Sequence, residues 1–160
     1  MEDKETRVLV ADDDASIREL LCTLVRREGL TADCAADGVE ALALLKEYSY
    51  KVILIDLMMP RMDGFAVIEH LKSQPQSDRP TVLVITAYTD QTFRNVDSEI
   101  VAGVIRKPFE VREIGELVRI CATASHSRLT EILTTTSDRI IRSVEPAAPA
   151  VQAPTRRSDH

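Results

Sequence analysis

The sequence predicts a three-layer α/β domain built on a parallel sheet, and three observations support this. Short apolar runs alternate with segments of helical period from residue 7 to residue 123. Most of these runs are continuous, which is typical of strands that helices cover on both faces. Turn residues such as Gly29, Gly38 and Pro80 separate the segments. Alternation of this kind favours parallel strands joined by right-handed helical crossovers.

The expected elements follow in order along the chain. Strands are predicted at 7–11, 31–35, 51–56, 81–86 and 102–106. The first helix should end at Gly29 and bury one apolar face, formed by Ile17, Leu20, Leu21, Leu24 and Val25. Further helices are expected at 39–48, from Gly64 onward and at 111–121, whereas 90–99 is poorly patterned.

Composition narrows the class of protein. The chain has 160 residues, of which 44% are hydrophobic and 29% charged, as in a globular domain with an appendage. A net charge of −6 argues against nucleic-acid binding as its main task. The sequence has neither an apolar run of about 18 residues nor a signal segment, so we expect a cytoplasmic protein without membrane insertion.

The three cysteines carry no metal or redox spacing. Cys22, Cys34 and Cys121 are far apart in the sequence and lie in apolar stretches. We therefore expect three buried free thiols.

Polar residues follow four of the predicted strands, where each strand ends. They are Asp12, Asp13 and Asp14 after the first strand, Asp56 after the third, Thr86 in the fourth and Lys107 after the fifth. Carboxyl ends of parallel strands meet at one edge of the sheet, where ligands of such folds bind. A single aspartate there can be only a helix N-cap, as Asp14 before Ser16 can be, but the whole set indicates a site.

The chemistry of this set suits phosphoryl transfer. Clustered carboxylates repel one another unless a cation joins them, and oxygen ligands of this kind suit Mg²⁺. No histidine or cysteine lies near for zinc. With the metal beside it, Asp56 could attack a phosphoryl group whose remaining oxygens contact Lys107 and Thr86. Pro60 and Gly64 are expected to shape a tight loop there.

Four segments, "VLVADDDASIRELL", "VILIDLMMPRMDGF", "VLVITAY" and "VIRKPF", resemble the signature blocks of the receiver domain of two-component response regulators. The resemblance covers residues 6–123 and implies a flavodoxin-like fold of strand order 2-1-3-4-5, which receiver domains share. It also implies a role for each site residue. Asp56 would be the phosphoacceptor, and the Mg²⁺ ligands would be Asp12, Asp13, Asp56 and the backbone carbonyl of Met58. Thr86 would supply the switch hydroxyl, and Lys107, which precedes a cis bond to Pro108, would form the ion pair with the phosphoryl group.

Three features depart from the family pattern. Val104 occupies the position where an aromatic switch residue is usual, so the way the signal is relayed stays open. The stretch from Thr86 to Lys107 is one residue shorter than is common. The segment after residue 124 matches no output domain.

That last segment divides into two parts. Residues 124–144 are predicted to add a helix with a stripe of apolar residues, which could pack on its own domain, pair in a homodimer, bind a partner or fray. Residues 145–160 are rich in proline and alanine and are expected to form a flexible tail.

The resemblance implies a response regulator in a two-component phosphorelay. It would accept a phosphoryl group on Asp56 from a histidine kinase or histidine phosphotransfer protein and change its binding to a downstream protein effector, without direct nucleic-acid contact. It would catalyse only its own phosphorylation and dephosphorylation. Two alternatives stay open: a haloacid-dehalogenase-type phosphohydrolase that uses Asp12, on the pattern Asp12-x-Asp14-x-Ser16, and a degenerate receiver that binds proteins constitutively.

Overall fold

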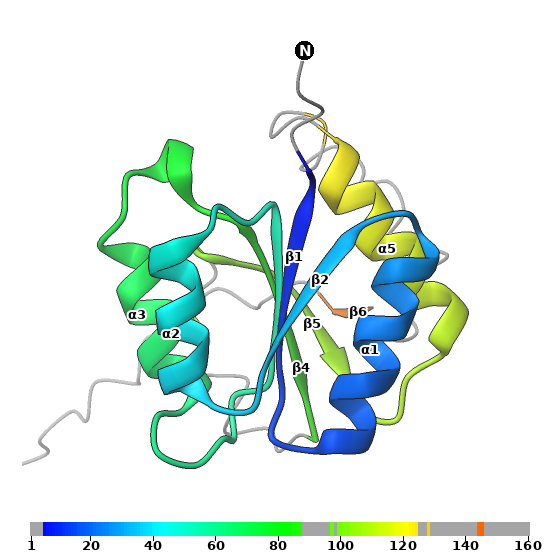
Figure 1. Cartoon of the computed structure of the whole chain (residues 1–160), viewed down its shortest axis with the longest axis horizontal. Helices are drawn as coiled ribbons and strands as arrows, with labels where there is room; N and C mark the ends of the chain where they lie inside the picture. The colour runs from blue at the N-terminus through cyan, green and yellow to red at the C-terminus, as the bar shows by residue number, and fades with distance from the viewer. Residues whose placement is uncertain (1–4, 88–96, 98, 125–127, 129–143, 146–160) are drawn as a thin grey trace, which may run out of the picture.

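A computed structural model of the chain describes residues 5–87, 97, 99–124, 128 and 144–145. Its sheet has the order β2-β1-β3-β4-β5-β6 (Figure 1). The five parallel strands are β1 (Arg7–Ala11), β2 (Thr31–Ala35), β3 (Val52–Ile55), β4 (Thr81–Thr86) and β5 (Val101–Arg106). The predicted order 2-1-3-4-5 is therefore confirmed, and a short antiparallel strand, β6 (Val144–Glu145), extends it beside β5.

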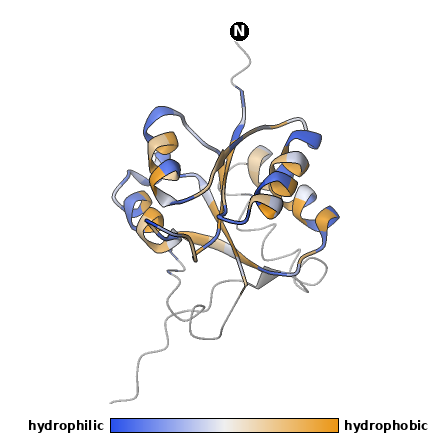
Figure 2. Ribbon diagram, turned by 60° about the horizontal axis from the view of Figure 1, so that its bottom comes forward, coloured by the Kyte–Doolittle hydropathy of each residue, from blue (hydrophilic) through white to orange (hydrophobic). Residues whose placement is uncertain are grey.

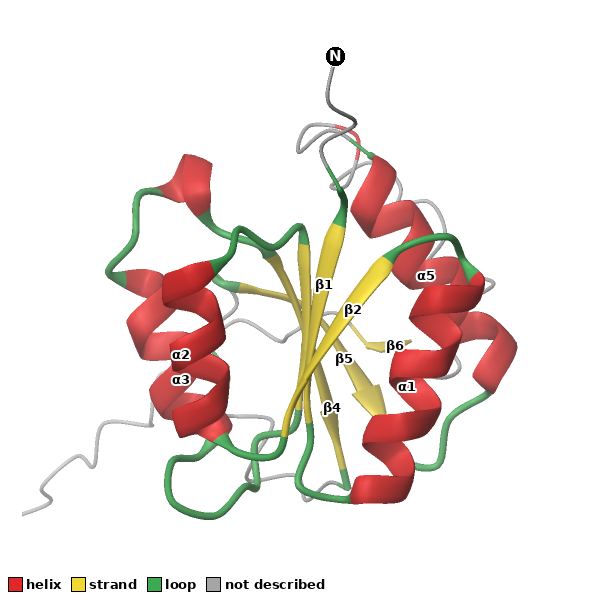
Figure 3. Cartoon of the chain, in the orientation of Figure 1, coloured by secondary structure: helices red, strands yellow, loops and turns green. Residues whose placement is uncertain are grey.

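Helices cover both faces of the sheet, as the continuous apolar strands predicted. They are α1 (Ala15–Arg27), α2 (Gly38–Glu47), α3 (Gly64–Lys72) and α5 (Val111–Thr123), with a short 3₁₀ helix, η1 (Gln76–Asp78). In Figure 3, α1 and α5 lie on one side of the sheet and α2 and α3 on the other. No helix in the described residues is long and apolar enough to cross a membrane.

The strands contribute side chains to two separate cores. In β1, Val8 and Val10 face the core under α1 and α5, whereas Leu9 and Ala11 face the core under α2 and α3. All four side chains are buried, which explains why this strand is apolar at successive positions. Figure 2 shows that each helix carries both apolar and hydrophilic residues, as helices that cover one face of a sheet do. Leu20, expected in the apolar face of α1, is 38% exposed, so that part of the prediction is wrong.

Aspartates begin three of the helices and a glycine ends one. Asp14, Asp37 and Asp63 each accept hydrogen bonds from backbone N–H groups in the first turns of α1, α2 and α3. Asp14 is therefore a helix cap, as the simpler interpretation of it proposed. Gly29 follows α1 with a φ of 77°, a left-handed conformation that glycine adopts readily.

The prediction of three free thiols is wrong for two of the cysteines. Cys22 of α1 and Cys34 of β2 form a disulfide with their Cα atoms 6.9 Å apart, and Cys34 is exposed. The helix packs directly on β2 and brings the two residues together, which their spacing in the sequence could not reveal. Cys121 is a buried free thiol, as predicted.

The segment after α5 is described only in part. Most of the helix predicted at 124–144 and of the tail predicted at 145–160 lies outside the described residues, as does most of 90–99. At the boundary between the two predicted parts, Val144 and Glu145 form β6 instead. A strand this short depends on its pairing with β5, and no local sequence pattern announces it.

Candidate functional site

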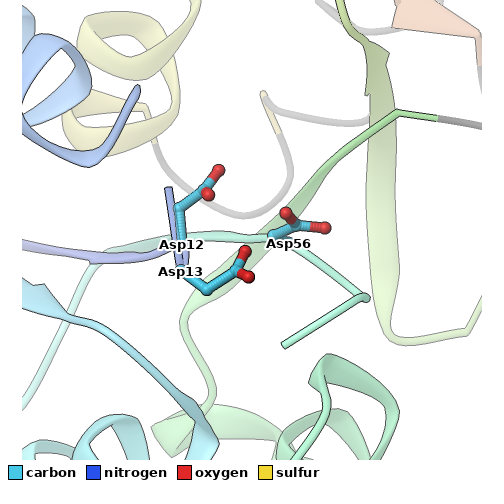
Figure 4. A group of neighbouring side chains, drawn as sticks. All are labelled: Asp12, Asp13 and Asp56. Carbon is cyan, nitrogen blue, oxygen red and sulfur yellow. The ribbon is translucent and has the colours of Figure 1, made fainter. Parts of the chain in front are cut away.

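Three aspartates from two neighbouring strands meet at the carboxyl edge of the sheet. Asp12 and Asp13 follow β1, and Asp56 follows β3, which pairs with β1 so that Ala11 lies opposite Ile55. Carboxylate oxygens of the three aspartates lie within 4.8 Å of one another (Figure 4). Asp12 and Asp56 are buried, whereas Asp13 is exposed. The sheet thus forms the acidic cluster that the sequence predicted.

Hydrogen bonds fix the acidic turn after β1. The N–H of Asp12 donates to the carbonyl of Ala35 at 3.1 Å, and the N–H of Asp14 donates to Asp12 Oδ1 at 2.9 Å. Arg18, one turn into α1, donates from Nη1 to the Asp12 carbonyl at 2.8 Å. These bonds hold Asp12 in place, and Asp13 stands beside it toward solvent. Sequence reasoning did not single out Arg18, because an arginine on a helix gives no sign that it will reach back to a strand end.

Lys107 joins the two buried carboxylates. Its Nζ lies 2.9 Å from Asp12 Oδ2 and 3.0 Å from Asp56 Oδ2, and its side chain is mostly buried. Burial by itself lowers the pKa of Lys107, but the hydrogen bonds that the ammonium donates to the two carboxylates outweigh it and raise the pKa above the ordinary value. The lysine therefore stays an ammonium ion. Its position follows from the end of β5, where the Lys107 N–H donates to the carbonyl of Thr86 at 3.1 Å.

Burial dominates the titration of Asp56. Desolvation raises its pKa above the ordinary value, although the N–H of Met58 at 3.0 Å and the Lys107 ammonium act in the opposite direction. The negative charge of Asp12 raises the pKa further. The ionised form of Asp56 therefore lacks full solvation, and an additional cation at the cluster would stabilise it.

Thr86 carries a hydroxyl that no group in the described part of the chain satisfies. Its side chain is 1% exposed, and within the described part of the chain Oγ1 has no hydrogen-bond partner. Burying an unpaired hydroxyl costs about 1–3 kcal/mol. This hydroxyl lies at the end of β4, and the Thr86 carbonyl is bonded to Lys107. A ligand with a hydrogen-bond acceptor that binds at this edge of the sheet could therefore pair with the hydroxyl.

The loop from Asp56 to Gly64 lies close against the strand end. Gly64 donates from its N–H to the carbonyl of Leu57 at 3.0 Å, and a Cβ on Gly64 would lie 2.4 Å from the carbonyl oxygen of Asp56. Only glycine fits this approach, which agrees with the tight loop predicted from Pro60 and Gly64. Within the loop, the side chain of Met58 is exposed, and its backbone is tied to Asp56.

The donor set fits a divalent cation that prefers oxygen ligands. Among the described residues, Lys107 pairs with two of these three carboxylates, and the Arg18 guanidinium contacts the Asp12 carbonyl. Three negative charges beside two positive ones leave negative charge at the cluster. Asp12, Asp13 and Asp56 would hold Mg²⁺, with the Met58 carbonyl as the expected backbone ligand. The assignment of these ligands remains a prediction.

The Lys107–Pro108 peptide bond is cis, as the resemblance implied. Val104, at the position where an aromatic residue is usual, is buried in the core under α2 and α3 and lies opposite Val84 of β4.

Comparisons with known proteins agree with this geometry. The chain is 37% identical over 117 residues to a probable transcriptional regulator, ycf27, of Porphyridium aerugineum, covering 72% of this chain and 48% of that protein. It is 38% identical over 110 residues to a transcriptional regulatory protein CpxR homolog of Haemophilus influenzae, covering 68% and 47%. The chain thus spans about half the length of these curated relatives.

Solved structures show the same fold. The chemotaxis response regulator CheY4 of Vibrio cholerae matches with a TM-score of 0.65 and 28% identity, covering 74% of this chain and 99% of that one. The response regulator TrrA of Thermotoga maritima, in complex with Mg(2+)-BeF, matches with a TM-score of 0.64 and 28% identity, covering 72% and 98%. Residues 8–119 match the family model of the response regulator receiver domain, and the chain belongs to this family.

Proposed function

We propose that this chain is a phosphorylation-dependent switch that accepts a phosphoryl group on Asp56. The observation that carries the proposal is the buried hydroxyl of Thr86, which has no hydrogen-bond partner among the described residues. It stands at the end of β4, whose neighbouring strand ends supply the ion pair between Lys107 and Asp56. A carboxylate, an ammonium and an unused hydroxyl are the groups needed to accept a phosphoryl group and contact its oxygens.

The transfer would take place at a carboxylate oxygen of Asp56. That oxygen attacks the phosphorus of a phosphohistidine on a histidine kinase or histidine phosphotransfer protein. A P–O bond forms, the P–N bond breaks, and the imidazole leaves with the electron pair and takes up a proton. Lys107 already lies 3.0 Å from Asp56 and would contact a phosphoryl oxygen, while Thr86 would donate its hydroxyl hydrogen to another. Mg²⁺, when bound, supplies positive charge that offsets the charge of the phosphoryl oxygens.

The result of phosphorylation would be a change in protein binding. Thr86 and Lys107 belong to β4 and to the end of β5, and the Lys107 N–H is bonded to the Thr86 carbonyl. A phosphoryl group that engages both side chains therefore acts on two neighbouring strands at once. With Val104 in place of an aromatic residue, we propose that movement of these strand ends relays the signal to a downstream protein effector in the cytoplasm, and that the effector's identity sets the output.

A small phosphodonor tests the proposal directly. We expect phosphoramidate with Mg²⁺ to add one phosphoryl group to the wild-type protein, measured by intact mass, and peptide mapping to place it on Asp56. Asp56→Asn should abolish the label. Asp14→Asn is the matched control, since asparagine also caps a helix and the site keeps its three clustered carboxylates.

Other results would support the alternatives. Label that persists in Asp56→Asn and disappears in Asp12→Asn would favour the phosphohydrolase. A wild-type protein that takes no label would favour the degenerate receiver.

A further inference from the structure

The loop that carries Met58 is held by an ion pair outside the acidic cluster. Arg61 donates from Nε to Asp37 Oδ2 at 2.8 Å, and its Nη2 contacts the same oxygen. Asp37 is buried, and its other oxygen accepts the N–H of Glu40 at 2.9 Å, which caps α2. The carboxylate is thus fixed to the start of α2, and Arg61 ties the loop to it.

The backbone at Arg61 shows that the loop needs such a restraint. Its φ is 63°, and it is the one residue other than glycine with a positive φ among the described residues. Side chains with a Cβ avoid this conformation unless the surrounding structure holds them there. The ion pair with Asp37 holds the side chain of Arg61 in place. It therefore opposes a change of the Arg61 backbone out of the left-handed conformation.

A second contact joins the loop to α2 beside the ion pair. The N–H of Gly38 donates to the carbonyl of Met62 at 3.0 Å, and a Cβ on Gly38 would lie 2.4 Å from that oxygen. Contacts at positions 61 and 62 thus hold the second half of the loop to α2. The first half is tied to the site, where the N–H of Met58 bonds to Asp56. Between these restraints lies the Met58 carbonyl, whose direction depends on the backbone of the loop.

We propose that Arg61 is a positioning residue for metal binding: its ion pair with Asp37 holds the 57–63 loop in the conformation that presents the Met58 carbonyl beside Asp56. The inference rests on the proposed function, because that function assigns the metal site. Arg61 itself touches neither the metal nor the phosphoryl group. It acts through the loop, so its loss should weaken Mg²⁺ binding more than it alters the fold.

The test measures Mg²⁺ binding by calorimetric titration and, separately, thermal unfolding without Mg²⁺. In Arg61→Ala and Asp37→Asn we expect the dissociation constant for Mg²⁺ to rise about tenfold, the lower end of what is lost when residues that orient metal ligands are removed. Asparagine keeps the cap of α2, so Asp37→Asn removes the charge and preserves the helix start. Arg61→Lys should restore part of the affinity.

Two further variants calibrate the measurement. Asp13→Ala removes a predicted ligand and should abolish binding. Arg112→Ala removes another exposed arginine, on α5, and should bind as the wild type does. Arg61→Gly removes the ion pair, but glycine adopts the left-handed backbone readily, so this variant should bind Mg²⁺ more tightly than Arg61→Ala and less tightly than the wild type. Wild-type affinity in Arg61→Gly would overturn the role of the ion pair.

Phosphorylation kinetics separate this proposal from a general structural role. With phosphoramidate, the labelling rate of Arg61→Ala should be low at limiting Mg²⁺ and return to the wild-type value at saturating Mg²⁺. A rate that stays low at saturation, or an unchanged dissociation constant in Arg61→Ala and Asp37→Asn, would overturn it. If the wild type itself neither binds Mg²⁺ nor takes label, the proposed function fails, which is a separate outcome.

Discussion

At the scale of single residues, the site consists of side chains that are far apart in the sequence and that the sheet brings together at one edge. Asp12, Asp56, Thr86 and Lys107 could be predicted to meet because each stands at the carboxyl end of a parallel strand. The rule did not predict that Lys107 bridges Asp12 and Asp56, because that contact depends on how far the lysine side chain reaches from the end of β5. Strand ends in a sheet of known order leave little freedom for such residues.

Other residues near the site could not be found this way. Arg61 lies in a loop, and neither its left-handed backbone nor its pairing with Asp37 has a local sequence signature. Asp37 precedes Gly38 in the sequence, and Asp-Gly is an ordinary turn pattern before a helix. The sequence therefore reveals groups whose position the sheet determines, and it does not reveal groups whose position depends on how a loop packs against a helix.

The protonation of Asp37 gives a prediction about stability. The N–H of Glu40 and, next, the Arg61 guanidinium hold the pKa of Asp37 below its ordinary value of 3.8. A lowered pKa in the folded state means that the ionised carboxylate stabilises the fold fully above pH 3.8 and that this contribution is lost as the pH falls through the lower folded value. Asp37→Asn should therefore be less stable than the wild type at pH 7, and the difference should shrink below pH 3.8.

Urea unfolding of both proteins at pH 7, 5 and 3 would measure this difference. The values at pH 7 and 5 should agree, and the value at pH 3 should be smaller. A difference that is the same at all three pH values would show that the charge of Asp37 contributes nothing and that only its capping geometry matters.

At the scale of elements, the parallel strands and most helix starts could be predicted. The continuous apolar runs gave β1, β3, β4 and β5 within a residue or so at each end, because burial on both faces requires apolar side chains at successive positions. Where an element depends on a distant partner, the prediction failed. The two-residue strand β6 exists through its pairing with β5, and Cys34 meets Cys22 because α1 packs on β2.

The cysteines give a prediction at this scale. Because Cys22 and Cys34 are joined, protein purified without reductant and unfolded in guanidinium should take up one iodoacetamide per chain, on Cys121. Reduction before unfolding should raise the count to three, the number of cysteines in the chain. In the native protein, burial raises the pKa of Cys121 to about 12, so this thiol should stay unlabelled at pH 8.

Intact mass spectrometry after labelling counts the thiols in each state. Serine substitution of Cys121 provides the control, since it should remove the single label from the unreduced protein and leave two in the reduced one. Three labels without reductant would show that Cys22 and Cys34 are free, as the sequence alone had suggested.

At the scale of the whole molecule, the two edges of the sheet differ. The edge at β2 carries the disulfide to α1, whereas the edge at β5 is paired with a segment from near the end of the described chain. Val104 and Ile105 of β5 lie opposite Glu145 and Val144 of β6. Strand β5 ends at Arg106, directly before Lys107, so β6 pairs with the strand that leads into the site. Composition and periodicity predicted a helix followed by a flexible tail here, because a strand of two residues leaves no periodic signal.

Pairing of β6 with β5 leads to a prediction about self-association. An unpaired edge strand presents N–H and C=O groups that can pair with another chain. Truncation after Ala124 removes β6, so the truncated protein should associate with itself more strongly than the full chain. Phosphodonor labelling of Asp56 should persist, because the acidic cluster, Thr86 and Lys107 all precede the cut.

Truncation after Glu145 is the matched comparison, since it removes residues 146–160 and keeps β6. Sedimentation velocity over a range of protein concentrations, with and without phosphoramidate, would compare the two proteins. If β6 protects the β5 edge, only the shorter protein gains a concentration-dependent larger species. If both proteins sediment alike in both phosphorylation states, β6 has no protective role. A dimer that is present in the longer protein and lost in the shorter one would instead assign residues 125–145 to a homodimer contact.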